Sequence, residues 1–331
     1  MSEPSSQELL RVADVTAGYG AGSRSARVLR GISLAVSPGR TLGIVGESGS
    51  GKSTLARVMA GQLRPSHGAV FLGGRDLGSL RRQDLRRARR QTQLIPQDHY
   101  SSLNPRMTVG ETLAEAINPR RSPRRGDRAR VNELLETVAL DADAGRRLPH
   151  EFSGGQRQRI AIARALAVQP QLIIADEITS ALDSSMQAEI LNLLLRLQRE
   201  RDLGYVIVTH DLSVAQYMCD EIAVLYLGRI AEHGSTRLLA RPAHPYTELL
   251  RDSIPDSSGR MLTELPHTVA AEPGDAGNPP SGCPFHPRCP HGPQVVTDRT
   301  ICGTSLPPLQ LAGEASVIYA ACHFPLSRAT A

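Results

Sequence analysis

The chain contains a single lysine, and it lies in a segment rich in glycine and serine. Arginine supplies 37 of the 38 basic residues, and Lys52 is the exception. A compact ammonium fits inside a tight backbone loop better than the broad, planar guanidinium of arginine. Backbone N–H groups of such a loop can surround phosphate oxygens, aided by the partial positive charge at the start of a helix. The segment comprises Gly46, Glu47, Ser48, Gly49, Ser50, Gly51, Lys52, Ser53 and Thr54.

The flanking residues supply the strand and the helix that a phosphate-binding loop requires. Residues 42–45 form a short apolar run, and residues 55–63 have a helical pattern that ends near Pro65. We predict that Lys52 reaches the β- and γ-phosphates of a nucleotide and that Ser53 binds Mg²⁺. An ordinary Gly/Ser turn is the alternative, which the complete match of the pattern in this context disfavours.

Two adjacent acids follow a second apolar run. Residues 172–175 are continuously apolar, as in a buried parallel strand, and Asp176 and Glu177 come next. A carboxylate at such a strand end can hold Mg²⁺ through water, and its neighbour can polarise the water that attacks the γ-phosphate. The same run is equally typical of a solvated strand end, so this prediction depends on the pairing with Lys52. We assign Asp176 to the metal and Glu177 to catalysis.

A second loop of serine and glycine lies between these two motifs. It contains Ser153, Gly154, Gly155 and Gln156 and directly precedes an apolar helical stretch at 160–168. Its backbone N–H groups and the Ser153 hydroxyl can bind another anion, and a plain helix cap is the alternative. With the two flanking motifs, the sequence resembles the ABC ATPase family, whose signature at this loop is Leu-Ser-Gly-Gly-Gln. Phe152 stands at the first position of that signature.

The resemblance implies roles for four further residues. Gln97 is similar to the Q-loop glutamine, which in that family contacts Mg²⁺ and the attacking water, and His210 to the switch histidine that contacts the γ-phosphate. Asp183 ends a segment from Ser180 that is similar to the D-loop, and Tyr19 is similar to the aromatic residue that stacks on adenine. The alternatives are surface polar residues for Gln97 and His210 and a packed strand-end tyrosine for Tyr19.

The family also implies an assembly. Two such domains pair head to tail, and each ATP lies between the phosphate loop of one and the signature loop of the other, which accounts for two anion loops in one chain. ATP closes the pair, hydrolysis opens it, and the cycle drives membrane partners. The chain departs from the family pattern at Pro96, at His99 and at Ile178, where the family has proline after the catalytic glutamate. These departures bear on coupling to the partners, not on ATP binding.

Further segments narrow the resemblance to the ATPases of oligopeptide/dipeptide importers. Residues 97–109 are similar to the extended Q-loop of these proteins, and residues 243–247, 249–250, 283–290 and 321–323 to their C-terminal extension. The resemblance implies ATP and Mg²⁺ as ligands and the import of short peptides, or of related cargo such as nickel chelates. It also implies two membrane permease subunits, a homologous ATPase chain in a heterodimer, and an extracellular binding protein that delivers the cargo.

Four of the five cysteines gather near the end of the sequence. Cys283, Cys289, Cys302 and Cys322 have the spacing C-x5-C-x12-C-x19-C, which matches no standard metal motif. In a reducing compartment four thiolates can hold a [4Fe-4S] cluster or Zn²⁺, and unligated thiols are the third alternative. Cys219 lies in a helical stretch away from this group, where we expect a small core residue.

The composition excludes several classes of protein. Apolar residues make up 40% and charged residues 21% of the 331 residues, as in folded globular proteins. The net charge of +5 is spread along the chain and aromatic residues are only 3%, which argues against a dedicated nucleic-acid binder. The six arginines of residues 81–90 therefore predict a solvated helix face. A soluble ABC ATPase acting on nucleic acid or ribosomes is the alternative to a transport subunit.

The expected location is peripheral, at the cytoplasmic face of the cell membrane. No run approaches the roughly 18 apolar residues of a spanning helix. Residues 1–10 are polar and acidic, whereas a secretory signal is basic and then apolar.

These motifs together require an α/β fold, a P-loop NTPase core with an antiparallel β subdomain and an inserted helical subdomain. We expect core strands at 42–45, 172–175 and 205–209 and antiparallel strands at 10–15, 28–36 and 69–72. The inserted subdomain covers about 98–165, with helices at 113–116 and 131–140 joined by an Arg-rich surface segment at 119–130. The predicted domains are a nucleotide-binding domain over 8–235 and a Cys-containing extension over 236–331, with a linker at 273–282.

Overall fold

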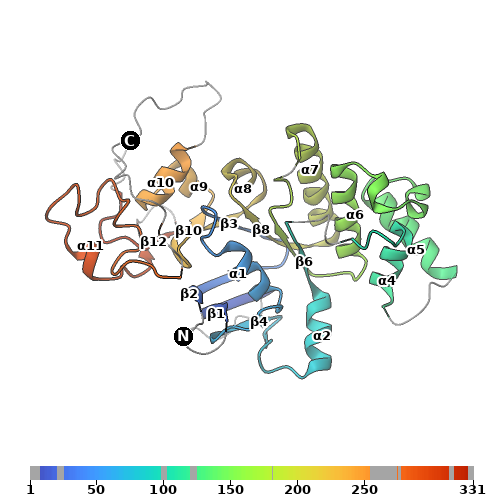
Figure 1. Cartoon of the computed structure of the whole chain (residues 1–331), viewed down its shortest axis with the longest axis horizontal. Coiled ribbons are helices and arrows are strands. Elements are labelled where there is room, and N and C mark those ends of the chain that lie inside the picture. The colour runs from blue at the N-terminus through green and yellow to red at the C-terminus, as the bar shows by residue number, and fades with distance from the viewer. Residues whose placement is uncertain are drawn as a thin grey trace. The chain divides into compact units, whose positions relative to one another are not determined.

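The chain divides into two compact units, each built from separate stretches of sequence. The computed structural model describes residues 8–20, 26–97, 103–119, 125–180, 182–253, 274, 277–312 and 317–326. The first unit comprises Met1–Leu10, Ala35–Arg40 and Phe71–Val208, and the second comprises Arg11–Leu34, Thr41–Val70 and Thr209–Ala331. Figure 1 labels many of the helices and strands of both units.

The first unit contains three parallel strands. β7 (Leu172–Asp176) lies between β6 (Thr92–Ile95) and β8 (Gly204–Thr209). β7 and β8 are buried along their whole length and β6 at its two ends. Parallel strands need a long crossover connection, and α7 (Ser184–Arg201) supplies the one from β7 to β8. The Tyr205 hydroxyl donates to the backbone carbonyl of Leu194 at 3.2 Å and so ties β8 to α7. The strands predicted at 172–175 and 205–209 are confirmed.

Three helices of the first unit pack together: α4 (Val109–Ile117), α5 (Arg125–Thr137) and α6 (Gly154–Leu166) (Figure 1). Two 3-10 turns, Ala142–Arg146 and Pro149–Glu151, connect α5 to α6. The predicted helical subdomain is therefore present, but the predicted helix bounds are wrong. Thr108 forms a capping box with Glu111 and starts α4 early, and α5 begins inside the stretch expected to join the two helices.

An arginine-rich helix, α2 (Arg82–Gln91), leads directly into β6. Ala88 is its buried residue, Leu85 is partly buried, and an ion pair joins Arg87 to Asp84 at 3.8 Å. The prediction of a solvated helix face is confirmed. Before this helix, β5 (Arg75–Asp76) pairs antiparallel with the end of β4 (His67–Leu72).

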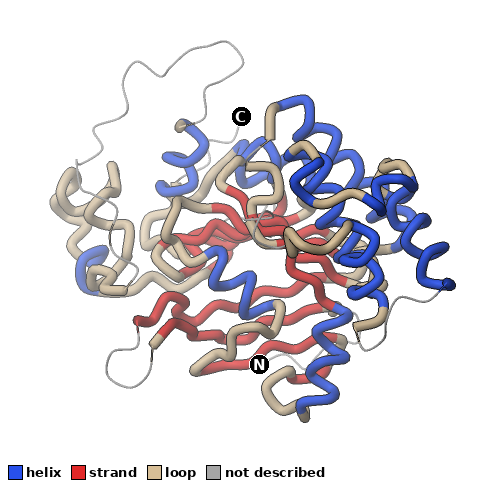
Figure 2. Tube along the Cα trace, turned by 45° about the vertical axis from the view of Figure 1, so that its right-hand side comes forward, coloured by secondary structure: helices blue, strands red, loops and turns tan. Residues whose placement is uncertain are grey.

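The second unit carries a mixed sheet to which the end of the chain contributes. β3 (Thr41–Val45) runs parallel to β9 (Glu221–Tyr226), which is antiparallel to β10 (Arg229–Ser235). β12 (Ile318–Ala320) then pairs with β10, and β11 (Gln310–Leu311) pairs with β12. Strands appear in red in Figure 2. The C-terminal part of the chain therefore adds strands to this sheet beyond β10.

A second group of strands, in the order β2-β1-β4, belongs largely to the same unit. It consists of β1 (Leu10–Tyr19), β2 (Ala26–Val36) and β4. Their alternating buried residues confirm the strands predicted at 10–15, 28–36 and 69–72. The remaining helices of the second unit are α1 (Lys52–Met59), α8 (Leu212–Met218), α9 (Arg237–Ala240), α10 (Pro245–Asp252) and α11 (Ile301–Thr304).

One hydrophobic core joins β9 to residues of the C-terminal part. Val224 and Tyr226 of β9 are packed with Tyr246 of α10, with Phe285 and with Ile318 of β12, all at most 4% exposed. Burial of such large side chains is worth about 1.5–3 kcal/mol each. Tyr246, Phe285 and Ile318, which all follow β10 in the sequence, are therefore part of a packed core.

Candidate functional site

The phosphate loop connects β3 to α1, as predicted from the sequence. Gly46 has φ 153°, and a Cβ there would lie 2.2 Å from the Leu225 carbonyl oxygen, so a side chain cannot be accommodated. Gly51 caps α1 with φ 105°, in the left-handed region that favours glycine. The loop therefore turns sharply where Gly46 contacts β9, and it ends at the N-terminus of α1.

Lys52 lies inside this loop. It is 5% exposed, and its Nζ donates to the backbone carbonyls of Gly46 and Glu47, both at 2.8 Å. The Ser50 Oγ is buried and has no hydrogen-bond partner among the described residues. A buried ammonium beside an unsatisfied hydroxyl and a helix start forms an electropositive concavity suited to an anion. Ser53, at the first turn of α1, is exposed.

Tyr19 is positioned against α1 by hydrogen bonds. Its hydroxyl accepts from Thr54 Oγ1 at 3.4 Å and from Arg57 at 3.3 Å, while the residue is 43% exposed at the end of β1. The structure therefore brings Tyr19 and the phosphate-loop helix together. His210, also in the second unit, directly follows β8 and is exposed.

The loop residue Glu47 contacts the C-terminal part of the chain. Its carboxylate accepts two hydrogen bonds from Arg288, at 2.8 and 2.9 Å, and its backbone N–H donates to the Tyr246 hydroxyl at 2.9 Å. These bonds raise the pKa of the Arg288 guanidinium, and burial raises the pKa of the Tyr246 hydroxyl. The sequence analysis missed Arg288 and Tyr246. Both lie in the tail segments that resemble the importer family, which was the only available signal.

In the first unit the structure brings together two predicted catalytic residues. Gln97 Nε2 donates to Glu177 Oε2 at 2.6 Å. Glu177 follows β7 with φ 49°, a left-handed conformation that is uncommon for a residue with a side chain, and its N–H donates to the Val208 carbonyl at 2.8 Å. Asp176 ends β7 and is 7% exposed, and Ile178 is buried.

The signature loop is the start of α6. The Ser153 side chain accepts from the Gln156 N–H at 3.3 Å, and Gln156 Oε1 accepts from the Ser153 N–H at 3.0 Å, which is a capping box. A Cβ on Gly155 would lie 2.0 Å from Met186 Cε. Asp183 caps α7 by accepting from the Met186 N–H at 2.9 Å. The alternative of a helix cap is thus observed, and it leaves the following backbone N–H groups at a helix N-terminus.

Some expectations concern residues outside the described part of the chain. These are Asp98 to Ser102 of the extended Q-loop, including His99, together with Ala181 of the D-loop and residues 273, 275 and 276 of the linker.

The four tail cysteines line one small cavity of about 20 Å³, together with His244, His286, His291 and His323. Burial, and secondarily the neighbouring thiols, raises the pKa of Cys283 to about 12 and that of Cys289 to about 11. In the described residues no set of three His, Cys, Asp or Glu side chains has an arrangement able to hold a metal ion. The cysteines therefore converge without forming a ligand set as they stand. Cys219 lies apart, at the end of α8, and packs against the hydrophobic core.

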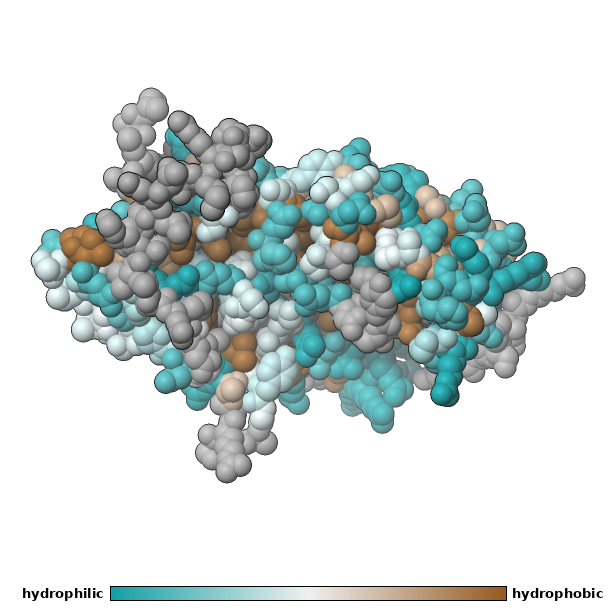
Figure 3. All heavy atoms as spheres, turned by 45° about the horizontal axis from the view of Figure 1, so that its top comes forward, coloured by the Kyte–Doolittle hydropathy of each residue, from teal (hydrophilic) through white to brown (hydrophobic). Residues whose placement is uncertain are grey.

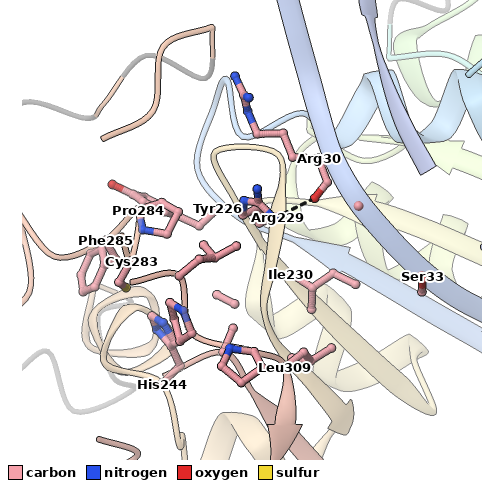
Figure 4. Close-up of a pocket in the computed structure, with 16 residues that line it drawn as sticks. Arg30, Ser33, Tyr226, Arg229, Ile230, His244, Cys283, Pro284, Phe285 and Leu309 are labelled. Carbon is pink, nitrogen blue, oxygen red and sulfur yellow. Dashed lines mark hydrogen bonds between the residues drawn. The ribbon is translucent and has the colours of Figure 1, made fainter. Parts of the chain in front are cut away.

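A larger cavity of about 300 Å³ lies beside the cysteine cavity, and His244, Cys283 and Phe285 line both (Figure 4). Arg229 points to it and donates to the backbone carbonyl of Arg30 at 3.2 Å. Complete burial lowers the pKa of His244 to about 4, so the imidazole is neutral at pH 7 and its Nδ1 accepts from the Tyr246 N–H at 3.0 Å. His244 therefore caps the helix that carries Tyr246.

Comparisons with known proteins agree with this geometry. The family model "ABC transporter" matches residues 29–180, and "Oligopeptide/dipeptide transporter, C-terminal region" matches residues 232–294. A "Probable peptide ABC transporter ATP-binding protein" of Sinorhizobium fredii is 44% identical over 90% of this chain and 82% of its own. The "Di/tripeptide transport ATP-binding protein DppF" of Pseudomonas aeruginosa is 39% identical over 96% of both chains.

Solved structures support the same fold. The protein cbiO1 from Clostridium perfringens, part of the ABC transporter complex cbiONQ, aligns with a TM-score of 0.64 and 28% identity over 71% of this chain and 92% of its own. A dimeric ATP-binding cassette bound to ADP and Pi aligns with a TM-score of 0.62 and 32% identity over 69% of this chain and 99% of its own.

The fold and the site define an ATP-binding cassette, an α/β P-loop ATPase. The chain belongs to the ATP-binding proteins of oligopeptide/dipeptide ABC transporters. The predicted fold class, family and ATPase activity are thereby confirmed.

None of the helices in the described ranges has the length and apolar character needed to cross a membrane. Hydrophilic residues cover much of the face shown in Figure 3.

Proposed function

We propose that this chain is the ATP-hydrolysing subunit of an importer of short peptides or related cargo. The observation that carries the proposal is the buried Lys52 inside a glycine loop at a helix start, in a chain whose relatives are peptide-transport ATP-binding proteins over nearly their full length. In this proposal residues 8–235 form the nucleotide-binding domain, with a helical subdomain at about 98–165, and residues 236–331 form the extension. The match of two family models to successive parts of the chain supports this division.

The loop residues bind the triphosphate. Lys52 exchanges its two carbonyl acceptors for β- and γ-phosphate oxygens, Ser50 Oγ gains a partner, and the helix start contributes its N–H groups. The half-exposed ring of Tyr19 stacks on adenine. Ser53, Gln97 and Asp176 offer hydroxyl, amide and carboxylate oxygens, the donors that Mg²⁺ prefers, and Mg²⁺ would neutralise charge on the phosphates.

Glu177 acts as the general base for the attacking water. The hydrogen bond from Gln97 holds its carboxylate, and the bond from its own N–H to Val208 holds its backbone. A carboxylate with one oxygen engaged still has lone pairs to accept a proton from water. His210 contacts the γ-phosphate in this proposal.

Two domains act together. Ser153, Gly154, Gly155 and Gln156, together with Asp183, bind the ATP held by the partner domain. The partner is a homologous ATPase chain in a heterodimer. The pair drives two permease subunits at the cytoplasmic face of the membrane, and an extracellular binding protein delivers the cargo. The names of the relatives support a transport role over action on nucleic acid or ribosomes.

The substitution Glu177→Gln tests the proposed role. We expect ATP binding to be retained and the turnover to fall by at least about 100-fold, because general-base catalysis contributes this much. Glu200→Gln, which changes an exposed glutamate at the end of α7, is the matched control and should hydrolyse ATP at the normal rate. Retained turnover in the Glu177 variant would contradict the assignment.

For the tail cysteines Cys283, Cys289, Cys302 and Cys322, a [4Fe-4S] cluster, Zn²⁺ and unligated thiols are the three alternatives. The cysteines line one cavity of about 20 Å³, but they form no ligand set as they stand, so a metal group would require their side chains to rearrange. No step of ATP hydrolysis depends on such a group. Iron, sulfide and zinc analysis of anaerobically purified protein decides between the cluster, Zn²⁺ and unligated thiols, and a sample without iron and sulfide contradicts the cluster.

A further inference from the structure

The second residue of the phosphate loop is held on three sides. The Glu47 carboxylate accepts two bonds from Arg288, the Glu47 N–H donates to Tyr246, and the Glu47 carbonyl accepts from Lys52. Glu47 lies between Gly46, which is wedged against the Leu225 carbonyl, and the turn that follows. Its carboxylate is bonded to Arg288, so it orients backbone atoms of the loop.

The contact with Arg288 is well shielded and has good geometry. The two side chains are 15% and 28% exposed, and both guanidinium nitrogens bond to separate carboxylate oxygens. Bidentate, charge-assisted bonds of this kind are stronger and more directional than the exposed pairs that contribute little. They fix the orientation of Glu47 as well as its position.

Arg288 is itself positioned by aromatic residues of the hydrophobic core. Its guanidinium carbon lies 6.0 Å from the ring centroid of Tyr226 and 5.9 Å from that of Phe285. The Tyr226 and Tyr246 rings are 4.5 Å apart, and Tyr246 and Phe285 are 5.3 Å apart. The two groups that reach Glu47 therefore come from one packed cluster, and Arg288 lies on the short segment between Cys283 and Cys289.

We propose that Arg288 and Tyr246 are positioning residues for the phosphate loop, by which the C-terminal extension sets the affinity of the chain for ATP. The inference rests on the proposed function of the loop. A loop held in its binding conformation loses less conformational freedom when the triphosphate binds. The extension thus acts on the nucleotide site without touching the nucleotide.

A double-mutant cycle on the full chain tests this proposal. The variants are Arg288→Gln, Glu47→Gln and their combination, and the probe is a non-hydrolysable ATP analogue with Mg²⁺ at equilibrium. We expect each single change to raise Kd about tenfold and the combination to raise it no further, because the two residues act through one contact. The kcat at saturating ATP should change by less than about twofold. Arg288→Lys keeps the positive charge but loses the two-pronged guanidinium geometry, so its affinity for the analogue should lie between those of the unaltered chain and Arg288→Gln.

Arg251→Gln is the matched control. Arg251 is another arginine of the extension, and it pairs with Asp252 at 2.7 Å without contacting the loop. It should leave Kd unchanged. Tyr246→Phe removes only the hydroxyl that accepts from the Glu47 N–H, and it should also raise Kd. It tests the same proposal if the Arg288 variant fails to fold.

Independent effects of Arg288 and Glu47, or an unchanged Kd in the Arg288 and Tyr246 variants, would overturn the positioning role. A simple loss of packing would lower the Tm without coupling Arg288 to Glu47. Failure of the unaltered chain to bind the analogue would instead refute the proposed function, so the two failures are distinguishable.

Discussion

The phosphate loop and the acidic end of β7 are both polar segments that follow a buried strand, but they are held in different ways. Lys52 bonds to loop carbonyls, and Glu47 bonds to Arg288, 241 residues further along the chain. The Glu177 carboxylate accepts a hydrogen bond from the side chain of Gln97, 80 residues earlier. The binding loop is therefore fixed through its backbone and by a packed core, whereas the catalytic carboxylate is bonded to a glutamine side chain, which can be displaced. The difference suits a tight binding element and an adjustable catalytic one.

The largest expected effect comes from removing the ammonium of the binding loop. Lys52→Ala should weaken ATP binding by about 1,000-fold, since a buried charge-assisted contact to the phosphates is lost. Lys52→Arg should be nearly as damaging, because the guanidinium is too broad for the loop. The measurement is equilibrium titration with Mg-ATP, with Arg241→Gln, at an exposed arginine outside the loop, as a control. An affinity that survives either lysine change would contradict the preorganised binding loop.

Much of the binding loop could be predicted from sequence, because its pattern is local. The strand and helix around Lys52 and the strand ending at Asp176 follow from apolar runs with marked ends. The start of α6 was placed too late, at 160, because the capping box of Ser153 and Gln156 makes a glycine pair helical. Helix propensity counts glycine as unfavourable inside a helix, so propensity alone does not predict a helix that begins at Gly154.

The residues that hold the loop could not be predicted in the same way. Arg288 and Tyr246 reach Glu47 across 241 and 199 positions, and no periodicity in the sequence encodes such a pair. The left-handed backbone of Glu177 was equally hidden, because it depends on the hydrogen bond to Val208 of a neighbouring strand. The residues that bind phosphate could therefore be predicted from the sequence, whereas the distant residues that hold them in place could not.

A change of pH should act on the core that holds the binding loop. His244 has a pKa of about 4 in the folded chain, below its ordinary value of 6.5, because it is fully buried. The unfolded chain therefore binds more protons between pH 4 and 6.5, so this stabilisation is complete above pH 6.5 and is lost as the pH falls toward 4. We expect a loss of about 2 to 3 kcal/mol in the free energy of unfolding between pH 7.5 and 4.5.

Denaturant unfolding across this pH range, with matched variants, isolates the contribution of His244. His244→Asn keeps a side-chain acceptor at the helix cap and should flatten the pH dependence. His150→Asn, at an exposed histidine, should leave it unaltered. An equal slope in the His244 variant and the unaltered chain would contradict the role of His244 in the pH dependence.

The smallest expected effect concerns the amide that sets the catalytic carboxylate. Gln97→Ala should lower kcat about tenfold and raise the KM for Mg-ATP only slightly, because it removes the hydrogen bond that orients Glu177 but only one of the three oxygen donors proposed for Mg²⁺. Gln93→Ala is the control, since Gln93 bonds to the Arg89 carbonyl at 2.6 Å and not to the acid. Steady-state ATP hydrolysis separates the two parameters. A raised KM with normal kcat would show that Gln97 acts in ATP binding and not in catalysis. It would also contradict the contrast between a rigid binding loop and an adjustable catalytic residue.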